Sequence, residues 1–206
     1  MLSVHASLVI GGYIGCFASG VFSVVLVAVP PGPVNANGSL RFISEGMNQH
    51  CGLANVLMGT FSLLVLACQL VVAAHLASPL LGWCALLQTL GWNVVLGVVD
   101  TGWTIHSAAL VVFLLAHAVF HTLVARHRLY GGPIYAVTNG LTWVFGVVFV
   151  SVGLTSMALG EGYATLRSFA VAFEFVLMLL LTIESACMVS ALDQFHDIHL
   201  RLTSRG

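Results

Sequence analysis

The chain has very little charge and contains no lysine. Only 6% of its 206 residues are charged, and all six basic residues are arginine. A soluble domain normally carries about a quarter charged residues, so this chain has too few to cover a water-exposed surface. Its hydrophobic content of 59% excludes a disordered chain as well. The formal charge of −1 includes no basic block, so we expect no nucleic-acid partner.

Motifs of several soluble and catalytic classes are missing too. The five cysteines show no C-x-x-C or other paired spacing, which argues against a disulfide framework and a cysteine metal site. The chain has no phosphate-binding glycine loop, no dinucleotide fingerprint and no H-E-x-x-H motif. A rhomboid-type G-x-S-G motif is also lacking, because Phe17 stands where its first glycine belongs. We therefore predict no cofactor and favour a non-enzymatic function.

Long apolar runs are abundant instead, and the mean hydropathy is +1.05. A helix needs about 20 apolar residues to cross a bilayer, and six runs meet that requirement. The predicted spans cover residues 8–29, 53–75, 80–99, 105–125, 134–157 and 169–191. The sequence therefore predicts an all-α polytopic membrane protein, with a six-helix transmembrane bundle as a single domain over residues 1–206.

Proline and glycine mark the ends of several spans. Pro30 follows the first span, Pro79 separates the second from the third, and Pro133 opens the fifth. The first connection, residues 30–52, is long, and the tail after the last span, residues 192–206, is short.

The first span also carries a face of small residues suited to close helix packing: Gly11, Gly12, Gly15, Ser19 and Gly20.

The arginines predict an orientation in the membrane. With the N-terminus inside, the inner side holds Arg126, Arg128, Arg201 and Arg205, while the outer side holds Arg41 and Arg167. Cytoplasmic loops are enriched in basic residues, so we expect both termini in the cytosol and the loop 30–52 outside. Asn37 begins an N-glycosylation sequon in that same outer loop.

Ionisable residues inside the spans are candidate functional groups, because an Asp there costs about 2.5 to 3.5 kcal/mol on the insertion scale. Five qualify: His106, His117 and His121 in the fourth span, and Glu174 and Glu184 in the sixth. The three histidines share one helix face, since eleven residues make about three turns and four make about one.

The i, i+4 spacing of His117 and His121 suits two ligands of one metal ion, with Glu184 as a third. However, no other span carries a second histidine pair at matching depth. A haem site would need such a pair on a facing helix, and the lack of one also weakens a metal site. We therefore predict neither a metal nor a haem site. The expected role of these imidazoles is hydrogen bonding between helices.

Glu174 lies inside the sixth span, five residues or about 7.5 Å along the helix from its predicted start. Its depth approaches that of His106, so we predict that the two side chains pair and that Asn93 and Asn139 add hydrogen bonds. Two interpretations stay open for this group: a polar clamp between helices, and a site for a lipid headgroup or a proton.

Three short motifs occur in an order that resembles a known family. They are Ile43-Ser44-Glu45-Gly46 in the first outer loop, Thr104-Ile105-His106-Ser107-Ala108-Ala109 in the fourth span, and Phe173-Glu174-Phe175 in the sixth. With six spans, this order resembles the DRAM family, the damage-regulated autophagy modulators. Related branches organise phosphatidylinositol 4-kinase or remodel GPI-anchor lipids, and the motifs do not choose between the branches.

The resemblance implies an endomembrane protein of the lysosome or Golgi, or a plasma-membrane protein, that modulates autophagy, lysosomal function or membrane-lipid organisation. Its implied partners are membrane lipids and other membrane proteins. His106 and Glu174 would form the central polar pair, and Ser44, Glu45 and Gly46 would shape the outer loop. Two alternatives remain: a lipid-remodelling enzyme with His106 and Glu174 as base and acid, and a small channel or transporter with the imidazoles as a proton path.

Overall fold

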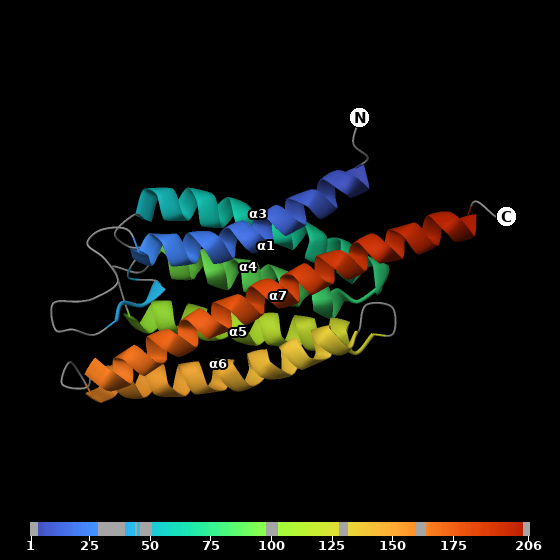
Figure 1. The fold of residues 1–206 in the computed structure, drawn as a ribbon. Helices are drawn as coiled ribbons and strands as arrows, with labels where there is room; N and C mark the ends of the chain where they lie inside the picture. Colours follow the sequence, from blue (N-terminus) through green and yellow to red (C-terminus); the bar gives the residue numbers. More distant parts are fainter. Residues whose placement is uncertain are drawn as a thin grey trace.

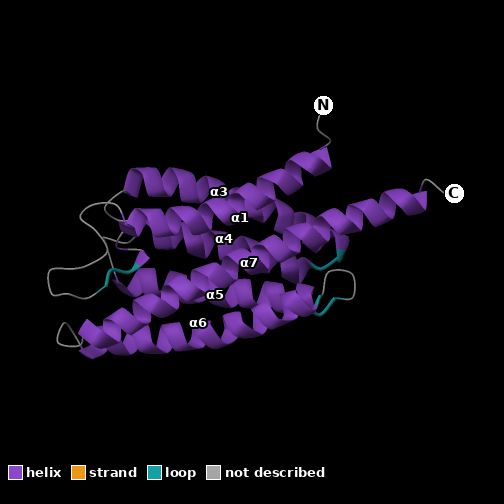
Figure 2. Cartoon of the chain, in the orientation of Figure 1, coloured by secondary structure: helices purple, strands orange, loops and turns teal. Residues whose placement is uncertain are grey.

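The computed structural model describes residues 4–28, 40–43, 45, 51–97, 103–127, 132–159 and 164–203. Six long helices account for nearly all of these residues (Figure 2). They are α1 (Val4–Ala28), α3 (Cys51–His75), α4 (Pro79–Gly97), α5 (Trp103–Ala125), α6 (Pro133–Leu159) and α7 (Ala164–Thr203). Each is long and apolar enough to cross a membrane, which confirms the predicted all-α polytopic bundle.

The helices begin and end close to the predicted spans, with the largest difference in α7. This helix has 40 residues, which corresponds to about 60 Å and is twice the thickness of a hydrocarbon core. Its membrane-compatible part covers Ala164–Gln194, and the helix then continues to Thr203. Its final turns therefore extend past the bundle (Figure 1). Hydropathy marks only the apolar part of a helix, so it does not indicate where the helix itself ends.

Helix packing closes the bundle into a ring. Each helix contacts the next along the chain from α1 to α7, and α7 returns to contact α1. The beginning of α1 and the end of α7 lie at the same end of the bundle (Figure 1). We call this the terminal end, and we call the opposite end, where α1 finishes and α7 begins, the loop end.

Apolar side chains cover both the inside and the outside of this ring. Two clusters of buried residues fill it: one includes Phe42, Trp92 and Phe149, and the other includes Phe120 and Met188. Large apolar side chains are also exposed on the outer faces of the helices, among them Ile14, Trp83, Leu115, Val144 and Leu179. A helix that is apolar on all sides suits a lipid environment.

The small-residue face of α1 is where that helix approaches its neighbours most closely. A Cβ atom at Gly12 would lie 2.5 Å from Sγ of Cys68, and one at Gly15 would lie 2.8 Å from the carbonyl oxygen of Phe61. These contacts confirm the predicted close packing, because only glycine leaves room for them.

A tight turn joins α3 to α4. Ala77 has a positive φ of 47°, and the amide of Ser78 donates to the carbonyl of Ala73 at 3.0 Å. Together with the bond from the Ala77 amide to the Ala74 carbonyl, this is a Schellman ending of α3. Pro79 then opens α4 at a position where a missing N–H costs nothing.

Candidate functional site

The polar residues inside the bundle form two separate groups. The first lies at the loop end and surrounds a cavity that Phe42 and Ile43 help to line; we call it the loop-covered cavity. The second consists of His117, His121 and Glu184, farther toward the terminal end, and we call it the histidine–glutamate cluster. The structure thus divides the ionisable residues predicted from the sequence between two depths.

Residues 40–43 and 45 are attached to the first turns of α7. The amide of Leu40 donates to Oγ of Ser168 at 3.2 Å, and Nε of Arg167 donates to the Leu40 carbonyl at 3.4 Å. The Arg167 guanidinium also forms an ion pair with Glu45 and lies 4.9 Å from the ring centre of Phe42. Arg167 therefore holds three residues of this segment at once.

Glu174 completes the attachment of the segment. Its Oε2 accepts a hydrogen bond from the backbone amide of Ile43 at 2.8 Å. A short local loop presents that amide, because the Phe42 amide donates to Oε2 of Glu45 at 2.9 Å and the Glu45 amide donates to the Phe42 carbonyl at 3.1 Å. The predicted loop residue Glu45 thus shapes the segment, and Glu174 binds its backbone.

The loop-covered cavity lies beneath Phe42 and Ile43 and has a volume of about 70 Å³. His106, Ser107 and Glu174 contribute polar groups to its wall. The rest is mainly apolar and comes from α4, α5, α6 and α7, including Trp92, Leu110, Phe149 and Leu177. The cavity can hold a small polar group, or an end of a larger molecule, next to a carboxyl and an imidazole.

His106 and Glu174 therefore line one cavity, and their direct pairing stays a prediction. The ring of His106 is buried and hydrogen-bonds with the backbone of Val95 on α4. Asn93 is exposed and donates to Oγ of Ser62 at 3.2 Å and to the Thr89 carbonyl at 2.8 Å. Asn93 thus links α4 to α3, and these two bonds involve neither His106 nor Glu174. Ser44, Gly46 and the sequon residue Asn37 lie outside the described residues.

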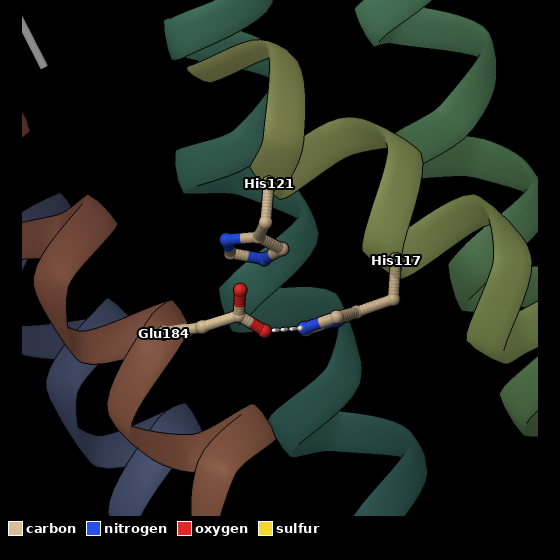
Figure 3. A group of neighbouring side chains, drawn as sticks. All are labelled: His117, His121 and Glu184. Carbon is tan, nitrogen blue, oxygen red and sulfur yellow. Dashed lines mark hydrogen bonds and ion pairs between the residues drawn. The ribbon is translucent and has the colours of Figure 1, made fainter. Parts of the chain in front are cut away.

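The histidine–glutamate cluster joins α5 to α7. Nε2 of His117 and Oε2 of Glu184 are 3.0 Å apart and share a hydrogen bond. The ring centres of His117 and His121 are 4.1 Å apart, and both rings face the carboxylate (Figure 3). All three side chains are inaccessible to solvent, with exposures of 1%, 0% and 0% in the order His117, His121, Glu184. None of them faces the lipid.

A second set of polar residues, from α5 and α6, holds this cluster in place. Asn139 donates from Nδ2 to Oε1 of Glu184 at 2.8 Å and accepts at Oδ1 from the Thr122 hydroxyl at 2.9 Å. Nε1 of Trp143 donates to the same hydroxyl oxygen at 2.8 Å. Nδ1 of His121 and the hydroxyl of Tyr135 share a hydrogen bond of 2.6 Å.

Asn139 thus contacts Glu184, not Glu174, and the reason is depth. Since α6 begins at the terminal end with Pro133, Asn139 lies about 9 Å from that end and is level with the last turns of α5.

Sequence reasoning missed Tyr135, Thr122 and Trp143. A signal for them is available, because Tyr135 and Asn139 are one turn apart and Thr122 follows His121 directly.

Comparison with known proteins does not place the chain in a family. No family model, no curated protein and no solved structure matches it. The fold, its six candidate spans and the two polar groups therefore come from this chain alone, which is a multi-pass membrane protein.

Proposed function

We propose that this multi-pass membrane protein organises membrane lipids and contacts them at the loop-covered cavity. The observation that carries this proposal is the division of the cavity wall into a polar part and an apolar part. His106, Ser107 and Glu174 bring the polar groups, whereas Leu110 and Leu177 belong to the apolar part. A lipid has the same division between its headgroup and its chains.

The depth of the cavity supports the same proposal. His106 lies in the first turn of α5, at the loop end of a span. Helix ends lie near the level of lipid headgroups, because a span of about 20 residues matches the hydrocarbon thickness. A volume of about 70 Å³ holds only part of a lipid, so the remainder of the molecule would stay in the bilayer.

The resemblance to the DRAM family agrees with a lipid-organising role. Two of the motifs that carry it, Ile43-Ser44-Glu45-Gly46 and Phe173-Glu174-Phe175, meet where the Ile43 amide donates to Glu174. On this basis the finer proposal is a modulator of autophagy or membrane-lipid organisation in the lysosome, the Golgi or the plasma membrane. Its partners would be membrane lipids and other membrane proteins.

Photo-crosslinking tests the cavity as a lipid site. The intact protein is placed in nanodiscs that contain a photoactivatable phospholipid, and crosslinked peptides are identified by mass spectrometry. We expect crosslinks on the cavity-lining parts of α5 and α7, reduced several-fold by Glu174→Gln. Asp193→Asn is the matched control, since it removes an exposed carboxyl from the same helix. Equal crosslinking in both variants and the wild type would contradict the proposal.

A lipid-remodelling enzyme is the second candidate, because His106 and Glu174 line the same cavity. The imidazole would act as general base and the carboxyl as general acid on a headgroup or acyl ester. Mass spectrometry of lipids incubated with the purified protein separates the two candidates. Turnover that His106→Ala abolishes favours the enzyme, and crosslinking without turnover favours the lipid organiser.

A further inference from the structure

We propose that His117, His121 and Glu184 form a binding site for a divalent transition-metal ion, with Zn²⁺ as the best match. The ligand atoms that these three side chains offer all lie within 4.8 Å of one another. They are the one group of this kind among the described residues. The site is distinct from the loop-covered cavity, and neither proposal depends on the other.

The donor set selects the class of ion. Two imidazole nitrogens and one carboxylate oxygen suit Zn²⁺ and related transition metals, whereas Ca²⁺ and Mg²⁺ prefer oxygen ligands throughout. Bonds of about 2.0 to 2.2 Å to a tetrahedral ion place neighbouring ligand atoms about 3.3 Å apart. Nε2 of His117 and Oε2 of Glu184 are already 3.0 Å apart. The other pairs of ligand atoms lie within 4.8 Å of one another, so each pair must approach by about 1.5 Å or less. Rotation of the side chains can supply a movement of this size.

The free nitrogen of His121 is a further sign of a ligand site. Within the part of the chain that the structure describes, Nε2 of His121 is buried and has no hydrogen-bond partner. Its Nδ1 is engaged with the Tyr135 hydroxyl, which fixes the orientation of the ring. A buried polar atom without a partner costs free energy, and a metal ion bound at Nε2 would remove that cost.

The surrounding hydrogen bonds resemble the outer shell of a metal site. Ligating histidines and carboxylates are usually held by a second hydrogen bond that fixes their orientation. Here Tyr135 holds His121 at 2.6 Å, and Asn139 holds Glu184 at 2.8 Å. A polar clamp between two helices needs only the bond between His117 and Glu184, so these extra contacts go beyond what a clamp requires.

A second cavity borders one of the three ligands, His117. That residue belongs to the wall of this cavity of about 70 Å³, together with the hydroxyl residues Ser62 and Ser185 and the amide residue Gln88. The wall is mainly apolar, but its volume and these few polar groups suit an ordered water. Three protein ligands and one water form the usual coordination of a zinc site that keeps an open position.

Zinc content and thermal stability test the proposal directly. The intact protein is purified in detergent, stripped with a chelator, dialysed against micromolar ZnCl₂ and assayed by inductively coupled plasma mass spectrometry. We expect about one Zn²⁺ per chain and a zinc-dependent rise in Tm. His121→Ala and Glu184→Gln should lose both effects, whereas His75→Ala, at the exposed end of α3, should keep both. Tyr135→Phe should lower the affinity about 10- to 100-fold.

A conservative variant separates a metal ligand from a purely structural histidine. Cysteine is a zinc ligand, so His121→Cys should retain zinc where His121→Ala does not, even if the alanine variant folds poorly. The proposal is overturned if the stripped wild type takes up no zinc and shows no zinc-dependent Tm. It is equally overturned if His121→Ala and Glu184→Gln bind as much zinc as the wild type.

Discussion

Single residues with several partners hold the two polar groups of this bundle together. Arg167 contacts the Leu40 carbonyl, the Phe42 ring and the Glu45 carboxylate, so one side chain connects α7 to the segment that covers the cavity. Asn139 has a similar position in the histidine–glutamate cluster, where it links Glu184 on α7 to Thr122 on α5. Loss of either residue would separate elements that are far apart in sequence.

A double-mutant cycle tests the ion pair between Arg167 and Glu45. The two side chains are 28% and 25% exposed, so solvent screens the pair and we expect a coupling free energy of about 0.5 to 1 kcal/mol. Unfolding in detergent of Arg167→Gln, Glu45→Gln and the double variant provides the measurement. Arg126→Gln, at an exposed arginine near the terminal end, is the control. Additive effects of the two substitutions would show that the pair contributes nothing.

The site residues could be predicted from the sequence only in part. The i, i+4 spacing of His117 and His121 is visible on one helix, and Glu184 could be named as their third partner. The bond between Ile43 and Glu174 spans 131 positions and depends on how a loop folds back on the bundle, which no periodicity encodes. The contact of Asn139 with Glu184 likewise requires the depth and rotation of α6 relative to α7.

At the scale of elements, the six helices follow directly from the apolar runs and from the proline residues between them. Pro79 and Pro133 are the first residues of α4 and α6, within one residue of the predicted starts. The continuation of α7 to Thr203 could not be predicted from hydropathy, because polar residues there are compatible with a helix in water. Hydropathy therefore locates spans better than helix ends.

The packing of α1 on α3 leads to a prediction at this scale. Gly15→Ala would place a Cβ 2.8 Å from the backbone oxygen of Phe61, and backbone cannot rotate away as a side chain can. We expect a loss of stability of about 1 to 3 kcal/mol, measured as a lower Tm in detergent. Gly11→Ala is the matched control on the same helix, because its nearest atom would lie at an ordinary 3.4 Å. Equal Tm values for the two variants would contradict this prediction, since they would show that α1 can move away from α3 at little cost.

At the scale of the molecule, the ring of helices places residues 40–43 and 45 at one end, and the beginning of α1 and the end of α7 at the other (Figure 1). His5 and Asp193, whose polar atoms are 3.3 Å apart, add a polar contact between α1 and α7 near the terminal end. The arrangement agrees with either orientation in the membrane, because in both of them the beginning of α1 and the end of α7 lie on the same side of the bilayer. The side itself is predicted by the arginines and by the sequon at Asn37.

Glycosylation decides the orientation. If the loop end faces the lumen or the exterior, wild-type protein from a glycosylating host should shift in mass after glycosidase treatment, and Asn37→Gln should remove the shift. A sequon engineered after Thr203 should stay unmodified. Modification of the tail sequon instead would reverse the predicted orientation.

The closure of the ring by α7 also determines when the bundle becomes complete during synthesis. Glu184, Glu174 and Arg167 all belong to α7, which is synthesised after the five other described helices of the ring, so His117 and Asn139 enter the membrane earlier. Until α7 inserts and contacts α1, His117 and Asn139 lack Glu184, their carboxylate partner, and are open to lipid. A chain truncated before α7 thus has a defect that membrane quality control can recognise. We expect such a chain to be retained and degraded.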